Sequence, residues 1–218
     1  HLASTHLEID AGDLTLKDGR VIARGAPERA LTFADLGRLA LPGSAFKLGI
    51  APGISEEDFF ATDKRPFPYG VHVAAVEVDK ETGKIKILDY LVTEDVGRKI
   101  NPMIIEGQLA GGLAQGIGGA LLEEFVYSED GQPLSTSFMD YLLPTAMEVP
   151  PLAIVDHCTP SPVTTFGQKG SGEAGYLGAP AAVANAVNDA LAPRGVRIDT
   201  LPMTEAAIDS GLTRDIYV

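Results

Sequence analysis

The sequence predicts an α+β fold with mixed sheets, hairpins and packed helices, rather than a doubly wound parallel sheet. Asp18-Gly19 lies between two short apolar-containing runs in residues 14–23, which is a strong hairpin signal. A second, longer hairpin is predicted for residues 71–92, where two apolar runs flank D-K-E-T-G-K. Residues 101–125 and 179–193 carry helix signals, so hairpins and helices are mixed along the chain.

The helix predicted for residues 101–125 is unusual inside. Asn101 is a good N-cap, and Pro102 follows at the first helical position, where its missing N–H costs nothing. Six interior glycines follow, at positions 107, 111, 112, 116, 118 and 119, and each costs roughly 1 kcal/mol relative to Ala. We therefore expect this helix to pack closely against another backbone or a buried ligand. The helix at 179–193 is ordinary, with Val183, Val187 and Leu191 on one stripe.

The remaining elements are shorter. Thr32 is expected to cap a helix that contains Leu36 and Leu39, and strands are expected at 125–134, 152–158 and 196–202. Residues 51–70 contain three prolines and show no clear period, which indicates a segment without regular structure, and residues 51–66 of it are predicted to be a crossing linker. The predicted organisation is a hairpin–helix segment at 1–50 that completes an upstream domain, this linker, and a main domain at 67–218.

Composition excludes several classes of function. The 218 residues carry a net charge of −13, which repels phosphate backbones and makes nucleic acid a poor partner. No apolar run approaches the roughly 20 residues of a membrane span. Cys158 is the single cysteine, so no internal disulfide can form, and a reducing, cytoplasmic location is expected.

One glycine-rich stretch, G-Q-K-G-S-G-E-A-G at 167–175, holds a lone carboxylate, Glu173. It can be a general base in a partly dehydrated pocket, where burial would raise its pKa, or a loop carboxylate that a helix dipole favours. Lys169 can meet an anionic ligand group beside exposed backbone N–H groups, or it can be a solvated surface lysine.

Other polar residues are open to two interpretations. Gln108 and Gln115 lie seven apart on one helix face, where they can bind a multidentate polar ligand or hydrogen-bond another helix. His72 lies on a strand and is expected to be a satisfied, half-buried histidine rather than a ligand. His157 and Cys158 lack a second cluster with metal-ligand spacing, so Cys158 is expected to be buried structurally.

Three stretches taken together resemble a known family. They are E-D-V-G-R-K-I-N-P-M-I-I-E-G-Q-L-A-G-G-L-A-Q-G-I-G, S-F-M-D-Y-L-L-P-T and G-Q-K-G-S-G-E-A-G-Y-L-G-A-P-A-A-V-A-N-A-V-N-D-A-L. Their order and spacing resemble the molybdenum-cofactor subunit of the xanthine oxidase and aldehyde oxidase family. The second stretch is most similar to the large-chain group of aerobic carbon monoxide dehydrogenases. The resemblance is weak over 1–66 and strong from about 67 to 205.

The resemblance implies the second half of a molybdopterin-binding domain. The cofactor is molybdopterin, often as its cytosine dinucleotide in bacterial members, and its dithiolene rather than a protein side chain holds the metal. Glu173 matches the catalytic glutamate, the base that activates the oxygen nucleophile while the substrate is oxidised. The cofactor-contacting positions are matched by Gln108, Lys169, Gly170, Ser171 and Gly172, and Gln115 falls in the same motif as Gln108.

The resemblance also implies partners. Family chains of this type are several hundred residues longer at the N-terminus, so this chain resembles the C-terminal part, inactive alone and dependent on the other half of the subunit. FAD and two-iron–two-sulfur centres are expected on partner subunits. The substrate would be small, of the aldehyde, heteroaromatic or carbon monoxide type. The alternative is a non-catalytic domain that serves as a scaffold or interaction module.

Overall fold

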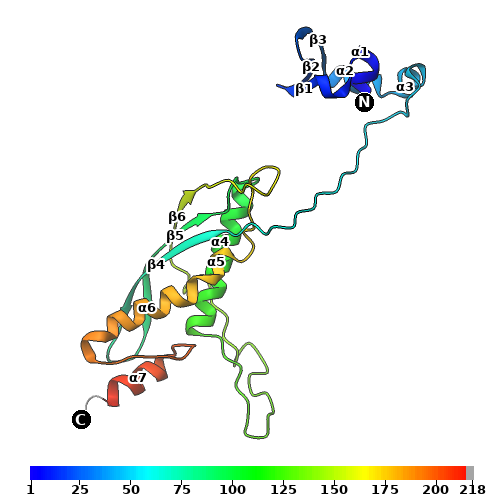
Figure 1. Ribbon diagram of the computed structural model, residues 1–218. Helices are drawn as coiled ribbons and strands as arrows, with labels where there is room; N and C mark the ends of the chain where they lie inside the picture. The colour runs from blue at the N-terminus through cyan, green and yellow to red at the C-terminus, as the bar shows by residue number, and fades with distance from the viewer. Residues whose placement is uncertain (215–218) are drawn as a thin grey trace. The chain divides into compact units, whose positions relative to one another are not determined.

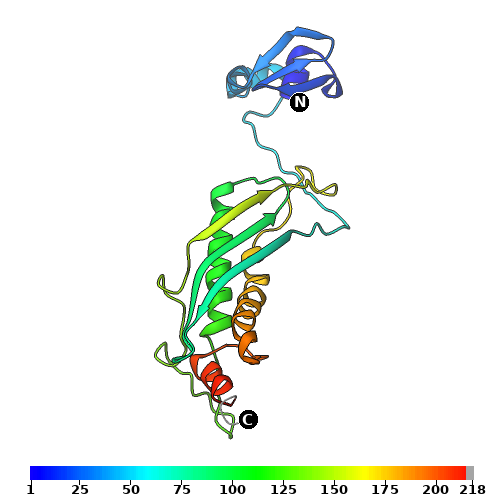
Figure 2. The ribbon, with the colours of Figure 1, turned by 90° about the vertical axis from the view of Figure 1, so that its left-hand side faces the viewer.

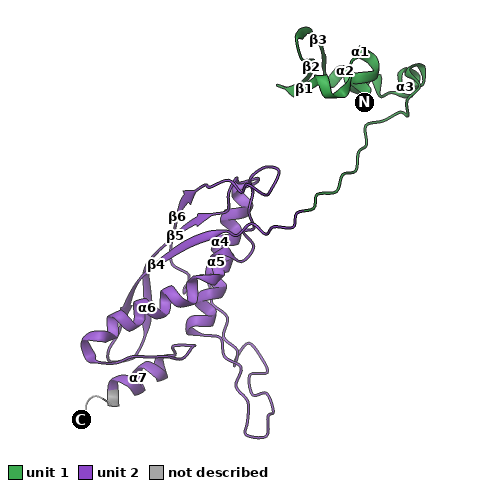
Figure 3. Cartoon of the chain, viewed as in Figure 1, with its two compact units in different colours: residues 1–61 green, residues 62–218 purple. Residues whose placement is uncertain are grey.

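The computed structural model describes residues 1–214. The chain divides into two compact units, residues 1–61 and residues 62–218 (Figure 3). Between the last element of the first unit and the first strand of the second, residues 51–68 form no helix or strand. The assignment of residues 1–50 to an upstream domain stays a prediction.

The first unit is a small three-stranded antiparallel sheet with short helices. Its strands are β1 (Leu14–Lys17), β2 (Arg20–Ala23) and β3 (Ala26–Thr32), in the order β1-β2-β3, and its helices are α1 (Leu2–Leu7), α2 (Phe33–Leu39) and α3 (Pro42–Ala45), with 3-10 turns η1 (Ala11–Asp13) and η2 (Phe46–Leu48). The predicted hairpin is confirmed, and its turn residues Asp18 and Gly19 both have positive φ, as a tight two-residue turn requires. β3 was not predicted.

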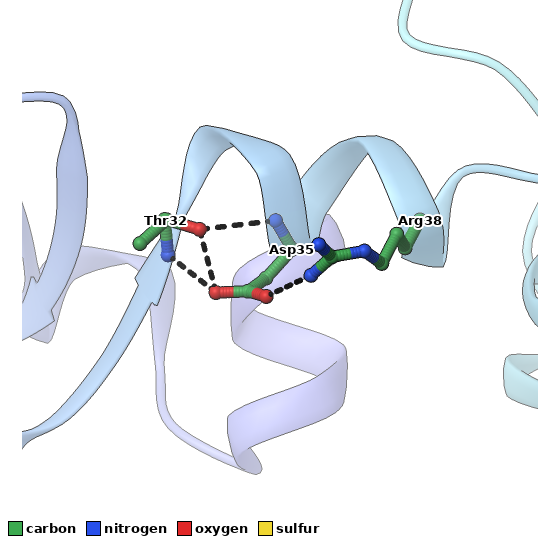
Figure 4. Close-up of polar contacts among 3 residues, drawn as sticks. All are labelled: Thr32, Asp35 and Arg38. Atoms are coloured by element: carbon green, nitrogen blue, oxygen red, sulfur yellow. Dashed lines mark hydrogen bonds and ion pairs between the residues drawn. The ribbon is translucent and has the colours of Figure 1, made fainter.

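The predicted cap of α2 is confirmed as a full capping box (Figure 4). The Thr32 hydroxyl accepts a hydrogen bond from the Asp35 N–H at 3.1 Å, and the Thr32 N–H donates to the Asp35 carboxylate at 3.0 Å. The Arg38 guanidinium lies 2.8 Å from the other carboxylate oxygen of Asp35. These contacts satisfy N–H groups that the first turn of a helix leaves free.

The second unit is built on a mixed sheet. Its elements are β4 (Tyr69–Val78), β5 (Ile85–Asp95), α4 (Pro102–Leu121), β6 (Leu152–His157), α5 (Ala174–Leu177), α6 (Ala179–Leu191), η3 (Ala192–Arg194) and α7 (Glu205–Arg214). β4 and β5 form the predicted hairpin, and β6 pairs in parallel with β5, so the order is β4-β5-β6. The α+β class and the mixed sheet are confirmed.

The helices α4 and α6 cover one face of this sheet (Figures 1 and 2). The main core lies between these layers and contains Tyr90 and Val92 from the sheet, Leu109 and Leu113 from α4, and the predicted stripe Val183, Val187 and Leu191 from α6. The opposite face keeps apolar side chains exposed, namely Val71, Val73 and Val155.

The start of α4 agrees with its prediction, because the Asn101 side chain accepts a hydrogen bond from the Ile104 N–H at 3.3 Å. The helix ends at Leu121, four residues before the expected end. The strand predicted at 125–134 is wrong, since only an isolated bridge joins Tyr127 to Pro133. Pro133 has no N–H to donate to a neighbouring strand, and none of the strands within residues 1–214 pairs with this loop.

The strand predicted at 196–202 is also wrong. The side chain of Asn188 on α6 takes both backbone groups of Ile198, donating to its carbonyl at 3.0 Å and accepting from its N–H at 2.8 Å. These bonds occupy groups that a strand partner would otherwise have used. The helix α7, which follows, was not predicted, although Thr204 accepts a hydrogen bond from the Ala207 N–H and so caps it.

Candidate functional site

The glycine-rich loop at 167–173 is attached to the segment that follows β5. The Lys169 N–H donates to the Val96 carbonyl at 2.8 Å, and the Arg98 N–H donates to the Gly167 carbonyl at 3.0 Å. Gly97 lies between these two bonds with a φ of +64°, and a Cβ added there would overlap the Gly167 carbonyl. Only a glycine lets the two backbones approach this closely.

Lys169 anchors the same loop through its side chain. Its ammonium lies 3.1 Å from the Asp95 carboxylate, and the two side chains are 6% and 7% exposed. The ammonium also lies 4.9 Å from the centre of the Tyr69 ring. Lys169 is therefore not a solvated surface lysine, because its charge is paired inside the unit.

Two adjacent carboxyl groups at the end of β5 have opposite character. Burial alone would raise the pKa of Asp95, but hydrogen bonds from Thr159, Gly97 and Lys169 outweigh it and hold the pKa well below its usual range. Glu94 is 2% exposed, and its Oε2 has no hydrogen-bond partner among the described residues. Burial, and secondarily the Asp95 charge, raise the pKa of Glu94 to about 7. Both residues lie in a quoted motif, yet we predicted no role for them.

The short helix α5 lies against the glycine-rich helix α4. A Cβ at Gly112 would lie 2.8 Å from the Tyr176 nitrogen, and one at Gly175 would lie 2.8 Å from the Leu109 Cα. The expected compensation by close backbone packing is confirmed at this contact. Gly107 and Gly111 have no described atom within 4 Å of an added Cβ, so this part of α4 is open.

Gln108 joins α4 to the loop, because its Nε2 donates to the Gly172 carbonyl at 3.3 Å. Gln108, Gly170, Gly172 and Glu173 are exposed, and Ser171 is half-buried. Over residues 1–214, the backbone N–H groups of positions 170 to 173 donate no hydrogen bond to the protein. The loop thus presents a run of free donors beside a carboxylate.

Gln115 is not part of this contact. It is exposed on α4 seven residues beyond Gln108, which places it about 10 Å further along the helix axis. The structure brings together the loop, Gln108 and Glu173, and leaves Gln115 at a distance along the same helix.

Glu173 is the residue before α5, and its backbone carbonyl accepts from the Tyr176 N–H at 3.0 Å and the Leu177 N–H at 3.1 Å. Its side chain is exposed, so the described residues do not supply the dehydrated pocket that we expected around it. They form an exposed surface with a carboxylate, a row of free amide donors and an open stretch of helix backbone.

His72 lies on the sheet face beneath α5 and is half-buried, as expected. Its Nδ1 is 2.8 Å from the hydroxyl oxygen of Tyr90, which is fully buried. Burial lowers the pKa of His72, while a hydrogen bond with the backbone of Ala174 opposes that shift. The prediction that His72 is a half-buried histidine with its hydrogen bonds satisfied is confirmed. Its contact with Ala174, the residue after Glu173, was not predicted.

Cys158 is exposed, so its predicted burial is wrong. It directly follows β6, where the chain leaves the sheet on the way to the loop that reaches Gly167. Within the described part of the chain, no three His, Cys, Asp or Glu side chains group in a way that could hold a metal ion. No helix among residues 1–214 is both long and apolar enough to cross a membrane.

Comparisons with known proteins agree with this architecture. Residues 1–150 match the family model of the molybdopterin cofactor-binding domain. The 6-hydroxypseudooxynicotine dehydrogenase complex subunit gamma of Paenarthrobacter nicotinovorans is 41% identical over 210 residues, covering 96% of this chain and 26% of that protein. The carbon monoxide dehydrogenase large chain of Afipia carboxidovorans is 36% identical, covering 88% of this chain and 23% of its own length.

Among solved structures, quinoline 2-oxidoreductase from Pseudomonas putida 86 superposes with a TM-score of 0.86 at 39% identity, covering 97% of this chain and 27% of that one. The chain spans about a quarter of the length of these relatives. The family-model match ends at residue 150, before the loop of Glu173, whereas the Paenarthrobacter relative is matched over 210 residues. The chain belongs to the molybdopterin cofactor-binding domain family and, within it, to the molybdenum-cofactor subunits of the xanthine oxidase family.

Proposed function

We propose that this chain forms one wall of the active site of a molybdenum hydroxylase or dehydrogenase, with Glu173 as the base. The observation that carries the proposal is the run of free N–H donors at positions 170 to 173, directly beside an exposed carboxylate. Successive backbone N–H groups in a glycine-rich loop suit a ligand with many oxygen acceptors or a phosphate. The family to which the chain belongs is named for binding such a ligand, the molybdopterin cofactor.

The residues present fit a flat, polar cofactor. Its ring nitrogens and oxygens need both donors and acceptors, which an exposed amide such as Gln108 supplies. Open backbone at Gly107 and Gly111 allows a planar group to lie against the helix. We assign the direct contacts to Gln108, Gly170, Ser171 and Gly172. Lys169 holds the loop in place through Asp95, and Gln115 serves a more distant part of the same ligand, such as a nucleotide extension.

When bound, the cofactor supplies the metal centre that accepts electrons from the substrate. The protein then has to position the substrate and move one proton. Glu173, exposed next to the donor row, accepts that proton from the oxygen nucleophile, and neither a histidine nor a serine partner is needed. The oxidised molecule would be small, of the aldehyde, heteroaromatic or carbon monoxide type.

Assembly with more protein is part of this function. The bare sheet face with Val71, Val73 and Val155 is the kind of apolar surface that packs against other protein. We propose that the rest of the molybdenum subunit covers it and closes the site, and that electrons pass to iron–sulfur and FAD centres on further subunits. A cytoplasmic location suits a chain with one exposed cysteine and no disulfide.

The test is reconstitution of the assembled enzyme with and without Gln108→Leu, using Gln132→Leu on a distant exposed loop as the matched control. We expect the parent and the control to retain molybdenum and to reduce a dye when substrate is added. In Gln108→Leu, the molybdenum content should be lower by at least about tenfold. Full molybdenum in Gln108→Leu would contradict the contact assignment. An assembled parent without molybdenum or dye reduction would favour a non-catalytic scaffold.

A further inference from the structure

Two polar side chains on the helix-facing side of the sheet have no role in the site as described above. His72 on β4 opposes Val92, and Tyr90 on β5 opposes Ala74, so the two lie diagonally on one face. Their rings meet edge to face with centroids 5.8 Å apart, in addition to the 2.8 Å hydrogen bond. Burying a polar group costs free energy unless it is hydrogen-bonded, a requirement that apolar side chains at these positions would not have. We therefore expect the His72–Tyr90 pair to have a function.

His72 contacts α5 at both of its ends. It hydrogen-bonds the backbone of Ala174, the first residue of α5. A Cβ added to Gly178, the residue after α5, would lie 2.8 Å from the Cγ of His72. One imidazole therefore spans the whole helical turn that begins directly after Glu173.

The helix α5 needs such support from outside. It has four residues, and an isolated helix of that length is not stable in water. No side chain caps its start at Glu173. Its C-terminal end is joined through Gly178 to α6, and the rest of its position is set by packing on two sides, against the backbone of α4 at Gly112 and against His72.

We propose that His72, held by Tyr90, is a positioning residue that fixes α5 and thereby the starting point of the Glu173 side chain. The proposal rests on the role of Glu173 proposed above. It gives His72 no contact with substrate or cofactor. Loss of the imidazole would let α5 shift or fray, and the carboxylate would spend less time where the proton has to be taken up.

The hydrogen-bond pattern agrees with a neutral imidazole in this role. Burial raises the pKa of Tyr90 to about 12, so its hydroxyl is protonated at neutral pH and can donate to Nδ1 of His72. In that arrangement the ring proton is on Nε2, from which it can be donated to the backbone of Ala174. Because burial also lowers the pKa of His72, this arrangement persists at neutral pH.

The experiment uses the assembled enzyme with His72→Phe, which keeps the ring volume, and Tyr90→Phe, which removes one oxygen. Tyr127→Phe, an exposed tyrosine on the loop after α4, is the matched control. We expect kcat to fall about tenfold or more in His72→Phe and about threefold in Tyr90→Phe, with KM and molybdenum content unchanged. Backbone hydrogen exchange at Tyr176 and Leu177 should rise in both variants and stay at the parental rate in the control.

A double variant separates this role from that of Glu173. In the Glu173→Gln background, His72→Phe should raise exchange as before but cause no further loss of turnover. A further loss of the same size would overturn the positioning role, as would parental exchange and kcat in both single variants. If Glu173→Gln alone turns over normally, the assignment of the base fails, and the exchange data still decide whether His72 fixes α5.

Discussion

The segments that adjoin the two ends of α4 differ in the contacts that fix their positions. Gln108 in the N-terminal half of α4 bonds to the loop at Gly172, and Gly112 at the middle of the helix packs on the backbone of α5. After the C-terminal end, residues 122–151 form a long loop that extends away from the helices (Figure 1). Several large apolar side chains on it are exposed to solvent, among them Met139 at 86% and Met147 at 89%.

The difference shows which part of the molecule determines its own geometry. The region around the N-terminal half of α4, which includes the loop with Glu173, is fixed by contacts within the chain: an ion pair, backbone hydrogen bonds and close packing at glycines. The long loop keeps large apolar side chains in solvent, which is typical of a surface that other protein covers. Substitutions at the first end should therefore change this unit directly, whereas loss of the exposed methionines Met139 and Met147 from the loop should act only on assembly.

The largest effect is expected for Lys169→Met in the assembled subunit. It leaves the Asp95 carboxylate buried and unpaired, so unfolding should cost about 3–5 kcal/mol less. Chemical denaturation measures this, with Arg197→Met as the matched control, because Arg197 and Asp199 form an exposed pair worth under about 1 kcal/mol. Equal effects of the two substitutions would mean that the buried pair does not hold the loop.

The next effect concerns the contact of α5 with α4. Gly175→Ala places a methyl group against the Leu109 backbone, which cannot move aside as a flexible side chain could, so a loss of about 3 kcal/mol is expected. Gly107→Ala is the control, because its site is open and alanine favours a helix by about 1 kcal/mol. Thermal unfolding compares the two, and destabilisation by both would show that the open stretch of α4 is covered.

A smaller, pH-dependent effect is expected for Glu94→Gln. The folded state keeps the Glu94 proton up to about pH 7, whereas the unfolded state loses it near 4.5, so stability falls as pH rises through that window. The variant should lack this decline and be more stable than the parent at pH 8 by about 2 kcal/mol. Glu77→Gln, exposed on β4, should keep the parental pH profile; identical profiles for all three proteins would refute a buried, protonated Glu94.

Much of the fold could be predicted because its signals are local. Asp18-Gly19 fixes a turn, Thr32 and Asn101 cap helices, and the stripe on α6 marks a buried face. The strand predictions at 125–134 and 196–202 failed for a non-local reason. Whether an extended segment joins a sheet depends on a partner, and here Asn188 takes the backbone of Ile198 instead.

The candidate site shows the same limit. Glycine spacing predicted close backbone packing along α4, and the packing at Gly112 follows it. Two contacts could not be predicted from local patterns: the ion pair of Lys169 with Asp95 and the contact of His72 with α5. Asp95 and Lys169 are 74 positions apart in the sequence, and His72 is 102 positions before Ala174. Glu94 carried no local signal, since its burial arises only from tertiary packing.

The central claim is that Glu173, at the end of the donor row, is the base of a molybdenum-dependent oxidation. Steady-state turnover of the assembled Glu173→Gln enzyme, with molybdenum measured in the same preparation, tests it most directly. Loss of a general base predicts turnover lower by at least about 100-fold at full molybdenum content. Turnover close to that of the parent, with molybdenum fully retained, would contradict the claim.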